Sequence, residues 1–216
     1  MSILQLFDYL FSLPKTIYFN LHYFPFSVAV RLPILVSYKV KLSKTGGVIK
    51  LPETVHTGLV KIGFSGSFAL GEKSYFENSG VLQFNGKATF SRGIQLIVGK
   101  EGCLEFGNGF RCNSNCIINC GKKVFFGNDC LLAWNITVLD GDGHIIIRKH
   151  SKMHEKSIYI GNHVWICPNS VILKGAKVGD GSIIATNTLI TKEIKDNDVL
   201  VGFTNTILES EVTWKD

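Results

Sequence analysis

The 216-residue chain is long enough for one well-packed domain or two small ones. Hydrophobic residues make up 45% of the chain, with 22 glycines and only 5 prolines, which excludes a disordered protein and indicates a turn-rich globular one. The net charge of +6 favours an anionic partner, but the basic residues are scattered, so we expect no nucleic-acid partner.

The first 40 residues are rich in aromatic and aliphatic side chains. They lack the basic start and the small-residue cleavage site of a signal peptide. Asp8, Lys15 and Arg31 interrupt the apolar run too often for a spanning helix, which needs about 20 apolar residues. We expect short helices packed over one end of a cytoplasmic protein. A peripheral contact of the apolar rings with the inner face of the membrane stays open.

From residue 84 onward, large apolar residues recur in steps of six. They form five triplets: Phe84/Phe90/Leu96, Phe106/Cys112/Ile118, Phe126/Leu132/Val138, Ile160/Ile166/Ile172 and Val178/Ile184/Ile190. Extra residues fall between triplets, after residues 96, 118 and 138, so these insertions leave from the same corner of a three-sided coil. The pattern predicts an all-β solenoid of short parallel strands. Ile62 and Phe68 indicate one more, irregular coil.

Four residues after each large apolar residue, the frame has a second position that mostly holds a small residue. It holds Ala88, Cys130, Val164, Ser170, Ala176, Ser182 and Thr188, with Phe110 as an exception. Two further cysteines take positions of this frame, Cys112 the large one and Cys116 the small one, and the chain has no paired CxxC motifs. We therefore expect the cysteines to be packed as small buried hydrophobes in a reducing cytosol, without zinc or disulfides.

The largest insertion opens with LDGDGHII (residues 139–146), which contains His144. An imidazole, with an ordinary pKa of about 6.5, is suited to remove a hydroxyl proton near neutral pH. Asp142, Asp140 or a backbone carbonyl of the loop could orient the ring. The two acids have an alternative role, because Asp-Gly pairs form tight turns without any part in catalysis.

The open ends of a solenoid need covers. We therefore divide the chain into an aromatic-rich N-terminal cap at 1–50, partly helical, a β-helix at 51–195 with a catalytic loop at 139–158, and a C-terminal cap at 196–216.

The segments IGNHVWI (160–166) and ILKGAKVGDGSIIATNTLITK (172–192) resemble the hexapeptide-repeat acyltransferases. The likeness covers roughly residues 80–205 and is closest to sugar and polysaccharide O-acetyltransferases of the maltose/galactoside type. It implies a left-handed parallel β-helix, a homotrimer with active sites between subunits, and acetyl-CoA as donor, with no metal. It also implies a glycan acceptor, acetylated on a sugar hydroxyl of a surface polysaccharide or its precursor.

The resemblance implies that His144 is the general base, with Asp142 as a candidate to orient it. Asn113 matches a family asparagine near the acceptor and the thioester end of the donor. Trp165 matches the tryptophan that lines the groove where the pantetheine arm meets the acceptor. We expect Trp134, one coil earlier at a similar phase, to stack on a sugar ring.

The positions that match the family's coenzyme A segment are Thr186, Thr191 and Lys192. Two features depart from the family pattern. Cys167 replaces a usual glycine, and GFTNT (202–206) lacks the usual proline and the basic residue that helps to hold the nucleotide end of coenzyme A. Lys174 is a candidate to replace that basic residue.

Three other functions stay open. The same base could serve N-acetylation of an amino sugar, and the altered GFTNT ending is compatible with a non-catalytic trimeric glycan-binding scaffold. β-Helical carbonic anhydrases share the architecture and hold zinc on histidines, and the histidines available for this are His144, His150, His154 and His163.

Overall fold

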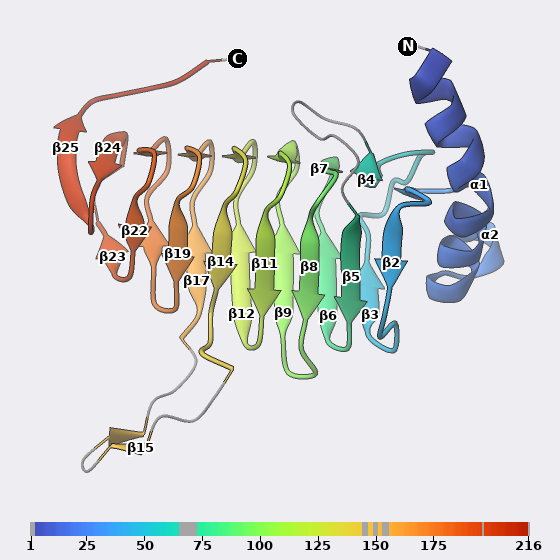
Figure 1. Cartoon of the computed structure of the whole chain (residues 1–216), viewed down its shortest axis with the longest axis horizontal. Helices are drawn as coiled ribbons and strands as arrows, with labels where there is room; N and C mark the ends of the chain where they lie inside the picture. Colours follow the sequence, from blue (N-terminus) through green and yellow to red (C-terminus); the bar gives the residue numbers. More distant parts are fainter. Residues whose placement is uncertain are drawn as a thin grey trace.

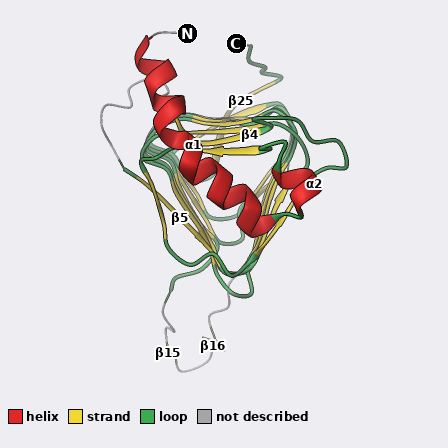
Figure 2. Ribbon diagram, turned by 90° about the vertical axis from the view of Figure 1, so that its right-hand side faces the viewer, coloured by secondary structure: helices red, strands yellow, loops and turns green. Residues whose placement is uncertain are grey.

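The computed structural model describes residues 3–64, 73–143, 147–148, 151–152, 156–195 and 197–215. Three mainly parallel sheets form the sides of a triangular prism, and the chain passes from sheet A to sheet B to sheet C in each coil (Figures 1 and 2). The prism has three edges, which we call the A–B, B–C and C–A corners.

The three sheets contain nearly all the strands. Sheet A contains β1 (Ile34–Val36), β4 (Val60–Phe64), β7 (Ala88–Ser91), β10 (Phe110–Cys112), β13 (Leu131–Leu132), β18 (Trp165–Ile166), β21 (Ile183–Ile184), β24 (Val199–Gly202) and β25 (Thr206–Ser210). Sheet B contains β2 (Val40–Leu42), β5 (Ser74–Asn78), β8 (Gln95–Val98), β11 (Ile117–Cys120), β14 (Thr137–Leu139), β19 (Val171–Leu173) and β22 (Leu189–Ile190). Sheet C contains β3 (Val48–Lys50), β6 (Val81–Phe84), β9 (Cys103–Phe106), β12 (Lys123–Phe126), β17 (Ile158–Ile160), β20 (Lys177–Val178) and β23 (Glu193–Ile194).

The strand register confirms the six-residue frame. Phe106 pairs with Phe84 on one side and with Phe126 on the other, and Phe126 pairs with Ile160. The rings of Phe84, Phe106 and Phe126 form a stacked column with centroids 5.6 and 5.5 Å apart. All fifteen residues of the five triplets are buried, so the hydrophobic core is a continuous rod along the prism axis.

The solenoid begins earlier in the chain than the sequence frame indicated. β1, β2 and β3 form a complete coil at residues 34–50, inside the region assigned to the N-terminal cap. Ile62 lies in β4 and pairs with Phe90, as expected for a further coil, whereas Phe68 lies outside the described residues. The cap therefore shares its last strands with the solenoid.

The C–A corner is held by a ladder of short polar side chains. The backbone N–H of Asn108 donates to the Asn128 side chain at 2.8 Å, that of Asn128 to Asn162 at 2.9 Å, and that of Asn162 to Asp180 at 2.6 Å. These side chains accept hydrogen bonds from backbone N–H groups in the turns, which have no partner in the hydrogen-bond ladders of the parallel sheets. The corner therefore repeats from coil to coil with little variation.

The N-terminal segment forms α1 (Ile3–Tyr23) and α2 (Phe26–Ala29), and α1 lies across the open end of the prism (Figure 2). At the other end, β25 pairs antiparallel with β24 and the chain then returns along the outside of the prism. No described helix has the length and hydropathy that a membrane crossing requires.

Candidate active site at the B–C corner

The predicted catalytic loop leaves the prism at the B–C corner, between β14 and β17 (Figure 1). The insertions predicted after residues 96 and 118 lie at the same corner, between β8 and β9 and between β11 and β12. The loop carries a short antiparallel hairpin of β15 (Ile147–Arg148) and β16 (Ser151–Lys152). Its two ends meet at the prism, because the backbone N–H of Lys156 donates to the carbonyl of Asp140 at 3.2 Å.

Asp140 anchors the start of this loop. Its buried carboxylate accepts backbone N–H bonds from Gly121, Lys122 and Lys123 in the preceding turn, at 2.6, 2.8 and 2.7 Å. The thiol of Cys120 also donates to it at 3.6 Å. A carboxylate with so many donors stabilises the turn below it, so Asp140 is an anchor of the loop, and Asp142 and the loop carbonyls remain the candidates to orient His144.

Asp142 forms an ion pair with Lys174, which follows β19 in the next coil. Two of the residues that the sequence predicts for the site are thereby brought together beside the loop, with side chains 35% and 22% exposed. Lys174 was expected to contact coenzyme A, and its ammonium lies at the loop base. His144 itself lies outside the described residues, as do His150 and His154.

Thr191 and Lys192 lie at the same corner, after β22, one coil beyond Lys174. The side-chain oxygen of Asn205 accepts their backbone N–H groups at 2.9 and 3.3 Å, and its amide donates to the Thr191 hydroxyl at 3.1 Å. Asn205 belongs to the GFTNT segment that departs from the family pattern. That segment therefore shapes the turn assigned to coenzyme A, a role that sequence reasoning missed.

The A–B corner holds a second group of predicted residues. Asn113, Trp134 and Thr186 lie at the turns that follow β10, β13 and β21. Trp134 is 38% exposed and borders a hollow of about 340 Å³ that Ser114 and Asn135 also line. An exposed indole beside polar side chains is typical of a surface that contacts a sugar ring.

Trp165 does not share the phase of Trp134, contrary to the sequence expectation. It pairs with Leu131 in β13, three residues before Trp134, so Trp165 lies on the outer face of sheet A and Trp134 lies at the A–B corner. The six-residue frame itself separates them, because Trp134 lies two residues after the inward Leu132 and Trp165 lies one residue before the inward Ile166.

The returning C-terminal segment covers part of sheet A beside Trp165. Trp214 stacks on His163 with ring centroids 4.2 Å apart and donates its indole N–H to the His163 carbonyl at 2.8 Å. The Trp165 ring lies 6.0 Å from that of Trp214. This cluster borders a cavity of about 530 Å³, also lined by Lys87 and Arg111, which sequence analysis did not single out.

The six cysteines are free, and five of them are buried as expected, whereas Cys103 is half-buried at the start of β9. Burial raises the pKa of the Cys130 thiol to about 12 and that of Cys167 to about 11. Both thiols are therefore protonated near neutral pH and are poor nucleophiles. Within the described part of the chain, no group of three or more His, Cys, Asp or Glu side chains is arranged to hold a metal ion.

The predicted residues thus lie at separate places around one prism. Asp142, Lys174, Thr191 and Lys192 lie at the B–C corner, Asn113, Trp134 and Thr186 at the A–B corner, and Trp165 on sheet A. One chain alone does not surround an acceptor and a donor with all of them.

Residues 157–192 match the sequence model of the family described as bacterial transferase hexapeptide (six repeats). The resemblance to hexapeptide-repeat acyltransferases is therefore confirmed, and the solenoid is a left-handed parallel β-helix. The crystal structure of the polySia-specific acetyltransferase NeuO superposes with a TM-score of 0.50 and 20% identity, covering 82% of each chain. At that identity the superposition establishes the fold alone.

Curated relatives share sequence with this chain over part of their length. A galactoside O-acetyltransferase of Lactococcus lactis is 31% identical over 83 residues, which is 37% of this chain and 40% of the relative. A polysialic acid O-acetyltransferase of Escherichia coli O1:K1 is 29% identical over 96 residues, which is 43% of this chain and 29% of the relative. The chain thus spans less than half the length of these relatives.

Proposed function

We propose that the chain is an O-acetyltransferase that moves an acetyl group from acetyl-CoA to a sugar hydroxyl of a surface polysaccharide or its precursor. The observation that carries the proposal is the position of the His144 loop. It leaves the β-helix at the B–C corner immediately before the segment that matches the transferase hexapeptide repeat. The named relatives act on galactosides and on polysialic acid, which supports a hydroxylated sugar as acceptor.

His144 is the proposed general base in a direct transfer. The imidazole takes the proton of the sugar hydroxyl while the hydroxyl oxygen bonds to the thioester carbonyl carbon. The carbon–sulfur bond then breaks, and the leaving thiolate receives the proton from the imidazolium. A covalent route through Cys167 is not supported, because burial raises the pKa of that thiol to about 11.

The chain's own residues position the loop for this step. Asp140 fixes where the loop starts, and the Asp142–Lys174 ion pair holds the loop two residues before His144. Asp142 is thereby a candidate to accept the second N–H of the imidazole, as an acceptor must for the ring to present its free nitrogen to the hydroxyl. Much of the rate of such a transfer comes from holding both substrates in place.

The donor is assigned to the turns at Lys174, Thr191 and Lys192, where two cations lie in successive coils. Lysine ammonium groups suit the phosphates of coenzyme A. The acceptor is assigned to Asn113 and to the two tryptophans, Trp134 and Trp165. Because these groups lie around different sides of one prism, we propose a homotrimer in which neighbouring subunits complete each site.

Calorimetric titration of acetyl-CoA into the purified chain tests the donor site. We expect saturable binding by the wild type and by His144→Ala, with thiol release from acetyl-CoA in the presence of an acceptor sugar only for the wild type. The acceptor panel includes sugars with free hydroxyls and amino sugars, so acetylation of the amine alone would replace O-transfer by N-transfer.

The scaffold alternative gives a different result in the same titration. If the wild type binds a glycan but not acetyl-CoA, the GFTNT segment has lost the donor site and the chain is a binding module. Asn205→Ala sharpens this point, because it removes the side chain that holds the turn at Thr191 and Lys192. We expect weaker acetyl-CoA binding by Asn205→Ala and unchanged glycan binding.

A further inference from the structure

Helix α1 is packed with its polar side inward. Asp8, Ser12, Thr16 and Asn20 follow one another at intervals of four residues and are all buried. The remaining outward surface is apolar. Its exposed side chains are Leu6, Phe7, Leu10, Phe11, Leu13, Ile17, Tyr18 and Leu21.

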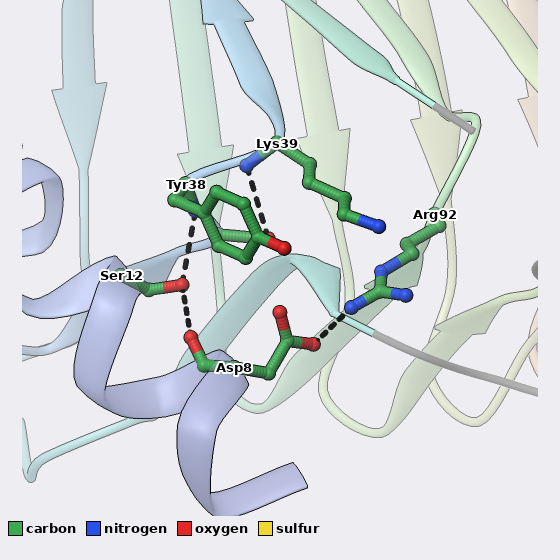
Figure 3. Close-up of polar contacts among 6 residues, drawn as sticks. Asp8, Ser12, Tyr38, Lys39 and Arg92 are labelled. Carbon is green, nitrogen blue, oxygen red and sulfur yellow. Dashed lines mark hydrogen bonds and ion pairs between the residues drawn. The ribbon is translucent and has the colours of Figure 1, made fainter. Parts of the chain in front are cut away.

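The reason for the inversion is the unpaired edge of the first coil. The Asn20 side chain accepts the N–H of Ile34 at 3.1 Å and donates to its carbonyl at 2.7 Å, and Thr16 accepts the N–H of Val36 at 3.0 Å. Ser12 accepts the N–H of Tyr38 at 2.9 Å, and Asp8 forms an ion pair with Arg92 (Figure 3). The polar stripe therefore completes the hydrogen bonds of an open edge strand.

The exposed apolar surface extends beyond α1. Phe26 and Val30, at and just after α2, are 75% and 55% exposed, and Tyr38, in the turn between β1 and β2, is 43% exposed. Helices α1 and α2 lie over the same end of the prism (Figure 2), and the Tyr38 ring lies 6.0 Å from that of Phe11 in α1. We call the exposed residues of α1 together with Phe26, Val30 and Tyr38 the apolar end face. So many exposed large apolar side chains near one end of a molecule are typical of a binding surface.

The segment that carries the apolar end face has a positive net charge, although one of its lysines, Lys44, pairs with Glu77 of the second coil at 2.9 Å. Residues 1–50 contain six Lys and Arg residues and one acid, Asp8, so they carry +5 of the net +6 of the chain. The acid is buried against Arg92, and Lys15 is bound to two backbone carbonyls at 2.6 Å. Arg31 and Lys41 are exposed beside the face.

We propose that the apolar end face docks on an anionic lipid bilayer. Aromatic and aliphatic side chains enter the boundary between headgroups and acyl chains, and the surrounding cations contact the lipid phosphates. α1 then lies in the plane of the membrane, and the prism stands away from it. Two copies meeting through this face would bring their like charges together, so charge complementarity favours the lipid surface.

Sedimentation of the full chain with phosphatidylcholine vesicles, with and without phosphatidylglycerol, tests the proposal. We expect binding to the anionic vesicles that weakens when salt rises from about 0.1 to about 1 M, because the Debye length falls from about 10 to about 3 Å. The triple variant Leu10→Gln, Phe11→Gln, Phe26→Gln leaves the inward polar stripe intact. We expect it to bind at least about tenfold more weakly.

The matched control removes exposed apolar side chains at the other end of the molecule. Phe203, Ile207 and Leu208 are 78%, 40% and 49% exposed, and their triple replacement by Gln is expected to leave vesicle binding within about twofold. A second pair, Arg31→Gln with Lys41→Gln, is expected to weaken binding to anionic vesicles at least about tenfold. Lys195→Gln with Lys215→Gln, two exposed lysines that lie outside the apolar end face, is its control.

Two results would overturn the proposal. One is a wild type that does not sediment with the anionic vesicles at low salt, while light scattering shows the triple variant to be a smaller oligomer than the wild type. The apolar end face would then join copies of the chain. The other is equal loss of vesicle binding in the apolar variant and in its control, which would mean that binding follows total apolar exposure. Thermal unfolding followed by circular dichroism confirms that each variant is folded.

Discussion

The B–C and C–A corners of the same prism differ in what their turns carry. From residue 84 onward, the C–A turns are short, and the turns at Asn108, Asn128 and Asn162 each donate a backbone N–H to an Asn or Asp side chain of the next coil. The B–C turns vary in length and include the loop between β14 and β17. The C–A corner keeps the coils stacked in register. The B–C corner can therefore contain loops with functional residues at a small cost in the free energy of folding.

The same difference appears in two acids. Asp180 at the C–A corner is exposed and accepts the Asn162 N–H, whereas Asp140 at the B–C corner is buried and accepts three backbone N–H groups. The loop leaves the prism directly after Asp140. The variable corner therefore needs a stronger anchor at the point where the regular pattern stops.

The largest expected effect is a loss of activity when the histidine of the loop at the B–C corner is replaced. His144→Ala should lower kcat by about 10²- to 10⁴-fold, because the hydroxyl loses its general base, with thermal stability unchanged. His56 is exposed on an early coil, so His56→Ala is the matched control and should keep its rate. Steady-state thiol release from acetyl-CoA measures both. A His144→Ala enzyme with wild-type kcat would place the chemistry elsewhere.

Asp140→Ala is expected to affect stability and activity together. Three backbone N–H groups lose a buried acceptor, which should lower the free energy of unfolding by about 3 kcal/mol or more. Because the loop starts at this residue, kcat should fall as well. Urea unfolding and steady-state rates on the same sample measure the two effects. Unchanged stability would show that water replaces the carboxylate and that the anchor role is wrong.

The frame of the solenoid could be predicted from the sequence because inward residues repeat in six. Ile160, Ile166 and Ile172 each pair with the residues that the frame assigns to the neighbouring coil. The coil at residues 34–50 was missed because Ile34, Val40 and Ile49 are not followed by an unbroken run of hexads. The phase of Trp134 was wrong because the two tryptophans take different positions of the frame, two residues after Leu132 and one residue before Ile166.

The polarity of α1 could not be predicted from its spacing. A helical period shows that a helix has two faces, and burial of the apolar face is the usual outcome. Here the backbone groups of the first coil need partners, and Asn20 and Thr16 supply them. The roles of Asp140 and Asn205 were missed for a related reason. Each accepts hydrogen bonds from backbone N–H groups of another turn. The amino-acid sequence does not show which backbone groups will lie near a given side chain.

Asn162→Ala probes the regular corner alone. The variant loses the acceptor for the Asn128 N–H and the side-chain contact with Asp180, and we expect a cost of about 1 kcal/mol. For a chain of this size that lowers Tm by about 2–4 °C. The rate at a temperature well below Tm should not change. A loss of activity without a loss of stability would show that the C–A corner takes part in the site.

The smallest expected effect is in the Asp142–Lys174 pair. The partly exposed ion pair should contribute about 0–1 kcal/mol to stability, so Asp142→Asn and Lys174→Gln should unfold at nearly the wild-type urea concentration. Their kinetic effects should differ, because Asp142 is assigned to the base and Lys174 to the donor. We expect Asp142→Asn to lower kcat several-fold and to shift its pH profile.

Lys174→Gln should instead raise KM for acetyl-CoA with kcat nearly unchanged. The double variant separates two explanations. If the pair only holds the loop, either single change breaks the pair. The double variant should then have the same kcat/KM as the less active of the two single variants. If each residue contacts its own substrate or base, the losses in kcat/KM multiply. A multiplicative result would place both residues in direct contact with the reaction, and a single shared loss would leave them as supports of the loop at the B–C corner.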